Sequence, residues 1–106
     1  IPALVSAQRE LREEAGIVAR QWSELLRMDL SNSASDEHAL IYLAQDLTFH
    51  TPQPDHDEEL ALRKVPFAEL LRMVMDGEVT DSLTVAAVLK VQVLLLQGGR
   101  DALAQK

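Results

Sequence analysis

"RELREEAGI", residues 9–17, places a dense group of charges directly before a glycine. Within it, Glu10 has two further glutamates three and four positions along the chain, Glu13 and Glu14. On a helix, at 100° per residue, the three side chains share an arc of roughly 100°. Like charges at these spacings repel each other by a few tenths of a kcal/mol per pair. The pattern therefore indicates either a bound cation or a face that is simply exposed to water.

The residues around this stretch predict a helix over residues 2–15. Pro2 suits the first helical position, and Gly16 suits the position just beyond the last turn. Apolar residues recur at spacings of three and four, which gives one face that can pack against the rest of a domain. This apolar stripe consists of Leu4, Ala7, Leu11 and Ala15.

Two strands are predicted to follow this helix. Residues 21–30 partly alternate, with Trp22, Leu26 and Met28 on one side and charged residues on the other. Residues 38–49 have a nearly continuous apolar centre, which is typical of a strand buried on both faces. Polar loops are predicted at residues 31–37 and 50–59, and a further short strand at residues 60–65.

Two more helices are predicted near the end of the chain. Pro66 opens the first, whose apolar residues lie at helical spacing and which Gly77 ends. The second begins at Asp81 or Ser82, either of which can cap it. Its run over residues 83–97 is apolar nearly all round, so we expect it to be buried. The order of elements predicts an α+β or α/β protein.

Composition limits the function classes. The chain has 106 residues, 47% hydrophobic and 25% charged, which is ordinary for one small soluble domain. Its net charge of −7 argues against nucleic acid as a partner, and the absence of cysteine excludes disulfides and cysteine-ligated zinc. The longest apolar run is shorter than the ~20 residues of a membrane span. No secretory signal is visible, which favours the cytoplasm.

The charged stretch carries a specific motif, R-E-U-x-E-E-x-G-U, where U is a bulky apolar residue. Five fixed identities and two apolar positions recur by chance about once in ten million start positions. The motif resembles the second half of the Nudix box, the signature of hydrolases that cleave a nucleoside diphosphate linked to another group. The matching residues are Arg9, Glu10, Leu11, Glu13, Glu14, Gly16 and Ile17.

The resemblance implies a role for each polar residue of the motif. Glu10 and Glu14 are expected to bind Mg²⁺ or Mn²⁺, with Glu13 as a further ligand or a close support. Arg9 is expected to be structural and to hold a glutamate in place, and Gly16 to end the helix. The chemistry agrees, because hard divalent cations prefer oxygen ligands and can neutralise a diphosphate while activating water.

Most of the chain resembles Nudix enzymes of the ADP-ribose or ADP-sugar pyrophosphatase type. The resemblance implies a homodimer that splits an ADP-ribose-like substrate or nucleotide sugar into a nucleoside monophosphate and a sugar phosphate. A late-loop acidic residue, either Glu58 or Glu59, is expected to act as general base or additional ligand. The implied fold is an α/β/α sandwich with a mixed sheet, of which residues 1–106 are a partial domain without the N-terminal strands.

Departures from the motif leave alternatives open. The complete Nudix box requires a glutamate where this chain has Ile1. The domain could therefore be a non-catalytic module that binds a nucleotide or a protein, or a dimerisation unit built on the final apolar helix. A separate transition-metal site in the loop at residues 50–57 is disfavoured, because its spacing matches no recognised ligand pattern. The residues of that rival site are His50, His56, Asp55 and Asp57.

Overall fold

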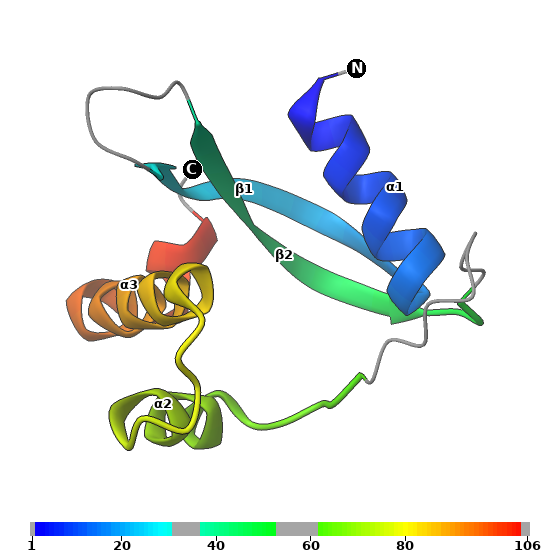
Figure 1. Ribbon diagram of the computed structural model, residues 1–106. Helices are drawn as coiled ribbons and strands as arrows, with labels where there is room; N and C mark the ends of the chain where they lie inside the picture. The colour runs from blue at the N-terminus through cyan, green and yellow to red at the C-terminus, as the bar shows by residue number, and fades with distance from the viewer. Residues whose placement is uncertain (1, 31–36, 53–61, 105–106) are drawn as a thin grey trace. The chain divides into compact units, whose positions relative to one another are not determined.

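The computed structural model describes residues 2–30, 37–52 and 62–104 (Figure 1). The described elements pair two strands in one sheet and add three α-helices and a 3₁₀-helix. Along the chain they are α1 (Ala3–Ala15), β1 (Ile17–Asp29), β2 (His38–Phe49), α2 (Phe67–Met75), α3 (Ser82–Gly98) and η1 (Gly99–Ala104). The chain forms two compact units, which consist of residues 1–22 with 42–63 and of residues 23–41 with 64–106.

The first unit contains α1, the start of β1 and the end of β2. Helix α1 begins after Pro2 and ends at Gly16, which has a left-handed backbone with φ of 68°. The N–H of Gly16 donates to the carbonyl of Arg12 and satisfies one of the last free carbonyls of the helix. The predicted helix and its end at Gly16 are therefore confirmed.

The two strands form an antiparallel pair. The N–H of Leu30 donates to the carbonyl of Glu37 next to the loop, and at the other end the N–H of His50 donates to the carbonyl of Gly16. Strand β2 has the predicted bounds, whereas β1 starts at Ile17, four residues earlier than predicted. The prediction was wrong because the apolar Val18 is exposed, which hides the alternation at the start of the strand.

Burial of the strands differs from the prediction in two ways. Strand β2 was expected to be buried on both faces, but residues 39–45 are only half-buried. A partner strand pairs along the edge of β2, whereas burial of a face requires another element to pack on it, so these apolar side chains stay partly accessible. In β1 the buried residue is Leu25, which is 4% exposed and lies on the face that the alternation assigned to charged residues.

The second unit contains α2, α3 and η1. Helix α2 follows Pro66, as predicted, and its last turn is clamped by Arg72. The guanidinium of Arg72 pairs with Glu69, with Asp76 at 2.8 Å and with Glu78 at 3.0 Å. Hydrogen bonds to Glu69 and Asp76 raise the pKa of Arg72 above its ordinary value. This exposed cluster ties the end of the helix to the turn that follows it.

Helix α3 is capped by Asp81, one of the two predicted capping residues. The Asp81 carboxylate accepts hydrogen bonds from the backbone N–H of Thr84 at 3.0 Å and from its hydroxyl at 2.8 Å. These bonds lower the pKa of Asp81, because they stabilise the charged form. The cap satisfies a free N–H of the first turn.

Two further expectations about this part of the chain are wrong. Residues 62–65 form no strand, and the rest of the predicted strand lies outside the described residues. Within α3 only Val88 is buried, whereas Leu89, Val93 and Leu96 are 40%, 49% and 77% exposed. These three lie on one side of the helix, so the described part of the second unit leaves an apolar ridge uncovered.

The long apolar segment Ser82–Leu103 meets a simple criterion for a membrane span. Its mean hydropathy is 1.5, and it is the one helix among the described residues that is long and apolar enough to cross a bilayer. This finding concerns length and composition alone, and the core helices of soluble proteins can meet the same criterion. The absence of a membrane partner therefore stays a prediction.

Candidate active site

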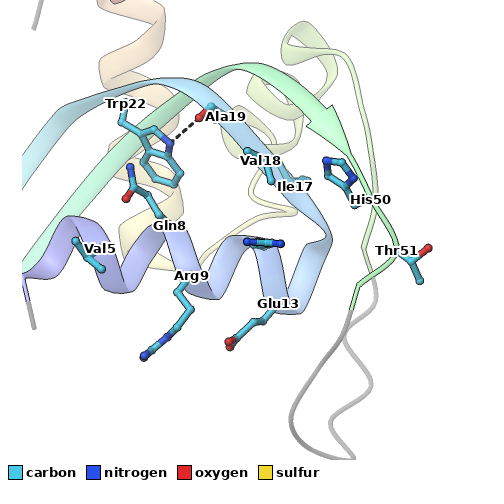
Figure 2. A pocket seen from close by; sticks show the side chains of 11 residues that line it. Val5, Gln8, Arg9, Glu13, Ile17, Val18, Ala19, Trp22, His50 and Thr51 are labelled. Atoms are coloured by element: carbon cyan, nitrogen blue, oxygen red, sulfur yellow. Dashed lines mark hydrogen bonds between the residues drawn. The ribbon is translucent and has the colours of Figure 1, made fainter.

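Helix α1 presents its charged residues in two directions. Glu10 and Glu14 are exposed and lie one turn apart, with side chains about 40° apart around the axis. Glu13 is half-buried and lines a pocket together with Arg9 (Figure 2). The helix thus separates an exposed pair of carboxylates from a pocket that contains both signs of charge.

The pocket lies within the first unit and has a volume of about 630 Å³. We call it the α1–β1 pocket, because most of its lining residues lie on one face of α1 and at the start of β1. Figure 2 shows its lining residues around one end of the hairpin. They are Val5, Gln8, Arg9, Arg12, Glu13, Ile17, Val18, Ala19, Trp22, His50 and Thr51.

Trp22 is held in a fixed orientation at one side of the pocket. Its indole N–H donates to the carbonyl of Ala19 at 3.1 Å, as the dashed line in Figure 2 shows. Its ring meets Tyr42 edge to face, with centroids 6.2 Å apart and planes 70° apart. The hydrogen bond satisfies the one polar atom of the indole, so the remaining ring surface is apolar.

A tight backbone junction closes the other side. The N–H of His50 donates to the carbonyl of Gly16 at 2.6 Å, and Gly16 itself is buried. A Cβ on Gly16 would overlap the carbonyl oxygen of His50 and come within 2.9 Å of its carbonyl carbon. The His50 ring lies 3.4 Å from the Thr48 hydroxyl and lines the pocket. Only glycine therefore fits where the helix meets the end of β2.

The charged side chains of α1 form no ion pair with the other described residues. Within residues 2–30, 37–52 and 62–104, no ion pair is formed by Arg9, Arg12 or the three glutamates of the motif. Arg20, an arginine of this unit outside the pocket, lies 4.0 Å from Asp46, and both side chains are exposed. The proposed clamp between Arg9 and a glutamate thus stays a prediction.

The carboxylates of Glu10 and Glu14 suit a hard cation, but the described residues do not supply a complete set of ligands. Glu10 and Glu14 offer carboxylate oxygens from adjacent turns, which is the ligand type that Mg²⁺ and Mn²⁺ prefer. In the described part of the chain, no three histidine, aspartate or glutamate side chains converge. Glu58 and Glu59, and His56 with Asp55 and Asp57 of the rival site, lie outside the described residues. The ligand assignment therefore remains a prediction.

Two proteins with similar sequences are both named ADP-ribose pyrophosphatase. The chain is 38% identical over 92 residues to an ADP-ribose pyrophosphatase of Mycobacterium tuberculosis, which covers 85% of this chain and 44% of the relative. It is 29% identical over 85 residues to an ADP-ribose pyrophosphatase of Bacillus subtilis, covering 78% and 46%. No family model matches the chain.

A solved structure of an ADP compounds hydrolase matches with a TM-score of 0.75 and 28% identity, over 90% of this chain and 51% of that one. Together with the nine-residue motif on α1, this match decides the family. The chain belongs to the Nudix family. It spans about half the length of the relatives that it matches, and its α+β architecture is that of a partial Nudix fold.

The Nudix motif located α1 and its glutamates, but it did not reveal the α1–β1 pocket. Arg12 occupies a variable position of the motif, the alternation places Trp22 only on one side of a strand, and His50 enters only through the disfavoured metal site. The hairpin brings His50 next to Gly16, although 33 residues separate them. No local periodicity reports such a contact, so the sequence alone offers no signal for it.

Proposed function

We propose that the full-length protein hydrolyses the diphosphate of ADP-ribose or a similar nucleotide sugar with the help of Mg²⁺ or Mn²⁺. The observation that carries this proposal is the complete R-E-U-x-E-E-x-G-U motif, which lies on a helix ended by Gly16. The names of the two relatives and of the structural match support the substrate class. The chain spans about half the length of these relatives, so the activity is proposed for the full-length protein.

The reaction adds water across the diphosphate. The water oxygen forms a bond to one phosphorus, the bond between that phosphorus and the bridging oxygen breaks, and the bridging oxygen leaves with the other phosphate. The water proton passes to a base, for which Glu58 or Glu59 is the candidate. The products are a nucleoside monophosphate and a sugar phosphate.

The motif glutamates would hold the cation for this reaction. Glu10 and Glu14 are its proposed ligands, and Glu13 supports them from the edge of the pocket. A bound divalent cation supplies charge neutralisation at the diphosphate and lowers the pKa of a bound water. The exposure of Glu10 and Glu14 leaves both carboxylates accessible to a cation that is also bound to substrate.

The direct test compares ADP-ribose hydrolysis by the full-length protein and its Glu14→Gln variant in the presence of Mg²⁺. Replacement of a metal ligand should lower the rate of hydrolysis by more than the roughly 10- to 100-fold that is typical when a residue hydrogen-bonded to a ligand is replaced. Glu24→Gln is the matched control, because Glu24 lies on β1 outside the motif and pairs with Arg27 at 2.9 Å. Equal rates in the wild type and Glu14→Gln would remove the motif from the mechanism.

The same assay separates the enzyme from a non-catalytic Nudix-derived module. If the wild-type protein forms no product but binds ADP-ribose equally well with and without divalent cation, the binding module replaces the enzyme. Calorimetry in the presence and absence of EDTA measures that difference.

We also propose that the protein is a homodimer located in the cytoplasm. Light scattering should give twice the mass of the full-length chain, and fractionation should recover the protein in the soluble cytoplasmic fraction. A monomeric mass would contradict the dimer, and recovery with membranes would contradict the location.

A further inference from the structure

We propose that the backbone N–H of His50 positions Glu14 for binding a divalent cation, because it fastens the last turn of α1 to the end of β2. The inference rests on the proposed function, in which Glu14 is a ligand, and adds a residue that would not touch the cation itself. His50 is then a positioning residue that acts through Gly16.

The last turn of α1 carries charges that destabilise it. Glu14 is one residue before the end of the helix, with Glu13 beside it and Glu10 one turn earlier. The C-terminus of a helix has a partial negative charge, so carboxylates there are unfavourable, and the three glutamates also repel one another. No ion pair with another described residue offsets this repulsion. Because helix ends fray, other contacts must keep Glu14 in place.

The junction between Gly16 and His50 supplies these contacts two residues after Glu14. The N–H of Gly16 donates to the carbonyl of Arg12 at 3.0 Å, and the carbonyl of Gly16 accepts from the N–H of His50 at 2.6 Å. Gly16 is buried, and a Cβ on it would lie 3.0 Å from the nitrogen of Pro52. The chain that follows β2 therefore packs directly against the end of the helix and holds its last turn.

This support matters because a cation shared by two carboxylates needs both of them at the same time. Helical turns lie on both sides of Glu10, whereas only Ala15 follows Glu14 in the helix. If the last turn unwinds, the Glu14 carboxylate leaves Glu10 and the cation loses an oxygen ligand. Coupling between two equilibria is reciprocal, so a bound cation must in turn stabilise the hydrogen bond from His50 to Gly16.

The experiment compares Mn²⁺ binding by His50→Pro and His50→Ala in the full-length protein, using the electron paramagnetic resonance of free Mn²⁺. Both variants lose the imidazole ring, but only proline also removes the N–H that donates to Gly16. We expect His50→Pro to bind Mn²⁺ at least about tenfold more weakly than His50→Ala, as is typical when a group that orients a ligand is lost. In a Glu14→Gln background the two should agree within about twofold, because the ligand that the junction positions is gone.

Two results would overturn the inference alone. One is equal Mn²⁺ affinity of His50→Pro and His50→Ala. The other is a difference that stays undiminished in the Glu14→Gln background, because the proline would then act elsewhere than on Glu14. A wild-type protein that binds no Mn²⁺ would instead overturn the proposed ligands, and this inference with them.

A measurement on the wild type decides if circular dichroism shows that His50→Pro is unfolded. Mg²⁺ must then slow the hydrogen exchange of the His50 N–H, because the coupling is reciprocal, and unchanged exchange would refute the inference. Hydrolysis is not measured in any of these experiments, so an inactive protein leaves the test intact.

Discussion

Replacing Gly16 with alanine tests the junction that joins the Nudix helix to the end of β2. Gly16 has φ of 68°, and its carbonyl accepts a hydrogen bond from the N–H of His50. The new methyl group would meet the backbone of His50, which cannot rotate away as a flexible side chain could. The helix end or the strand end must therefore shift.

The size of the effect follows from two contributions. A left-handed backbone costs alanine about 1–2 kcal/mol, and forcing a methyl group into packed atoms costs about 1–3 kcal/mol more. The stiffer unfolded chain returns about 0.4–1 kcal/mol. We therefore expect Gly16→Ala to lower the free energy of unfolding by about 2–4 kcal/mol, when the contributions are summed.

Gly77→Ala is the matched control. Gly77 also has positive φ, at 80°, but a Cβ there would meet nothing within 4 Å. It should lose only the backbone contribution, a net of about 1 kcal/mol. Urea unfolding of both full-length variants gives the two free energies. Equal losses would show that the close approach of Gly16 to His50 does not exist in solution.

Three further predictions concern stability, measured by thermal or urea unfolding of the full-length protein. Asp81→Ala should lower Tm by roughly a few degrees at neutral pH. Because the folded-state pKa of Asp81 is lowered, its contribution is present above the unfolded value of about 3.9 and is lost as the pH falls through the folded value. A Tm difference that does not shrink as the pH falls below about 3.9 would contradict the cap. Arg72→Ala should destabilise most at low salt and less near ~1 M salt, and a salt-independent loss would refute an electrostatic clamp. Leu25→Ala should cost about 2–5 kcal/mol and the exposed control Leu30→Ala less than about 1 kcal/mol, and similar losses would contradict the burial of Leu25.

Local chemistry in the sequence was enough to place most helix ends. Pro2, Gly16, Pro66 and Asp81 each mark a boundary because proline, glycine and a capping carboxylate act on their own backbone or on the adjacent turn. Strand β2 was also predicted with its observed bounds. The helix ends depend on residues within about four positions along the chain, so the information that sets them can be found in a single sequence.

Burial could not be predicted in the same way. Leu25 shares its face of β1 with charged residues, and the final helix has apolar residues on every side, so neither pattern tells which side chain is covered. The α1–β1 pocket depends on a contact between Gly16 and His50 that the hairpin creates. Such features depend on tertiary packing, which overrides the local pattern.

Mn²⁺ binding to the full-length protein, followed by the electron paramagnetic resonance of free Mn²⁺, tests whether Glu10 and Glu14 tolerate their mutual repulsion because they share a cation. Glu10→Gln and Glu14→Gln should each weaken Mn²⁺ binding at least about tenfold, while Glu24→Gln leaves it unchanged. Equal Mn²⁺ affinity in all three variants and the wild type would contradict the claim.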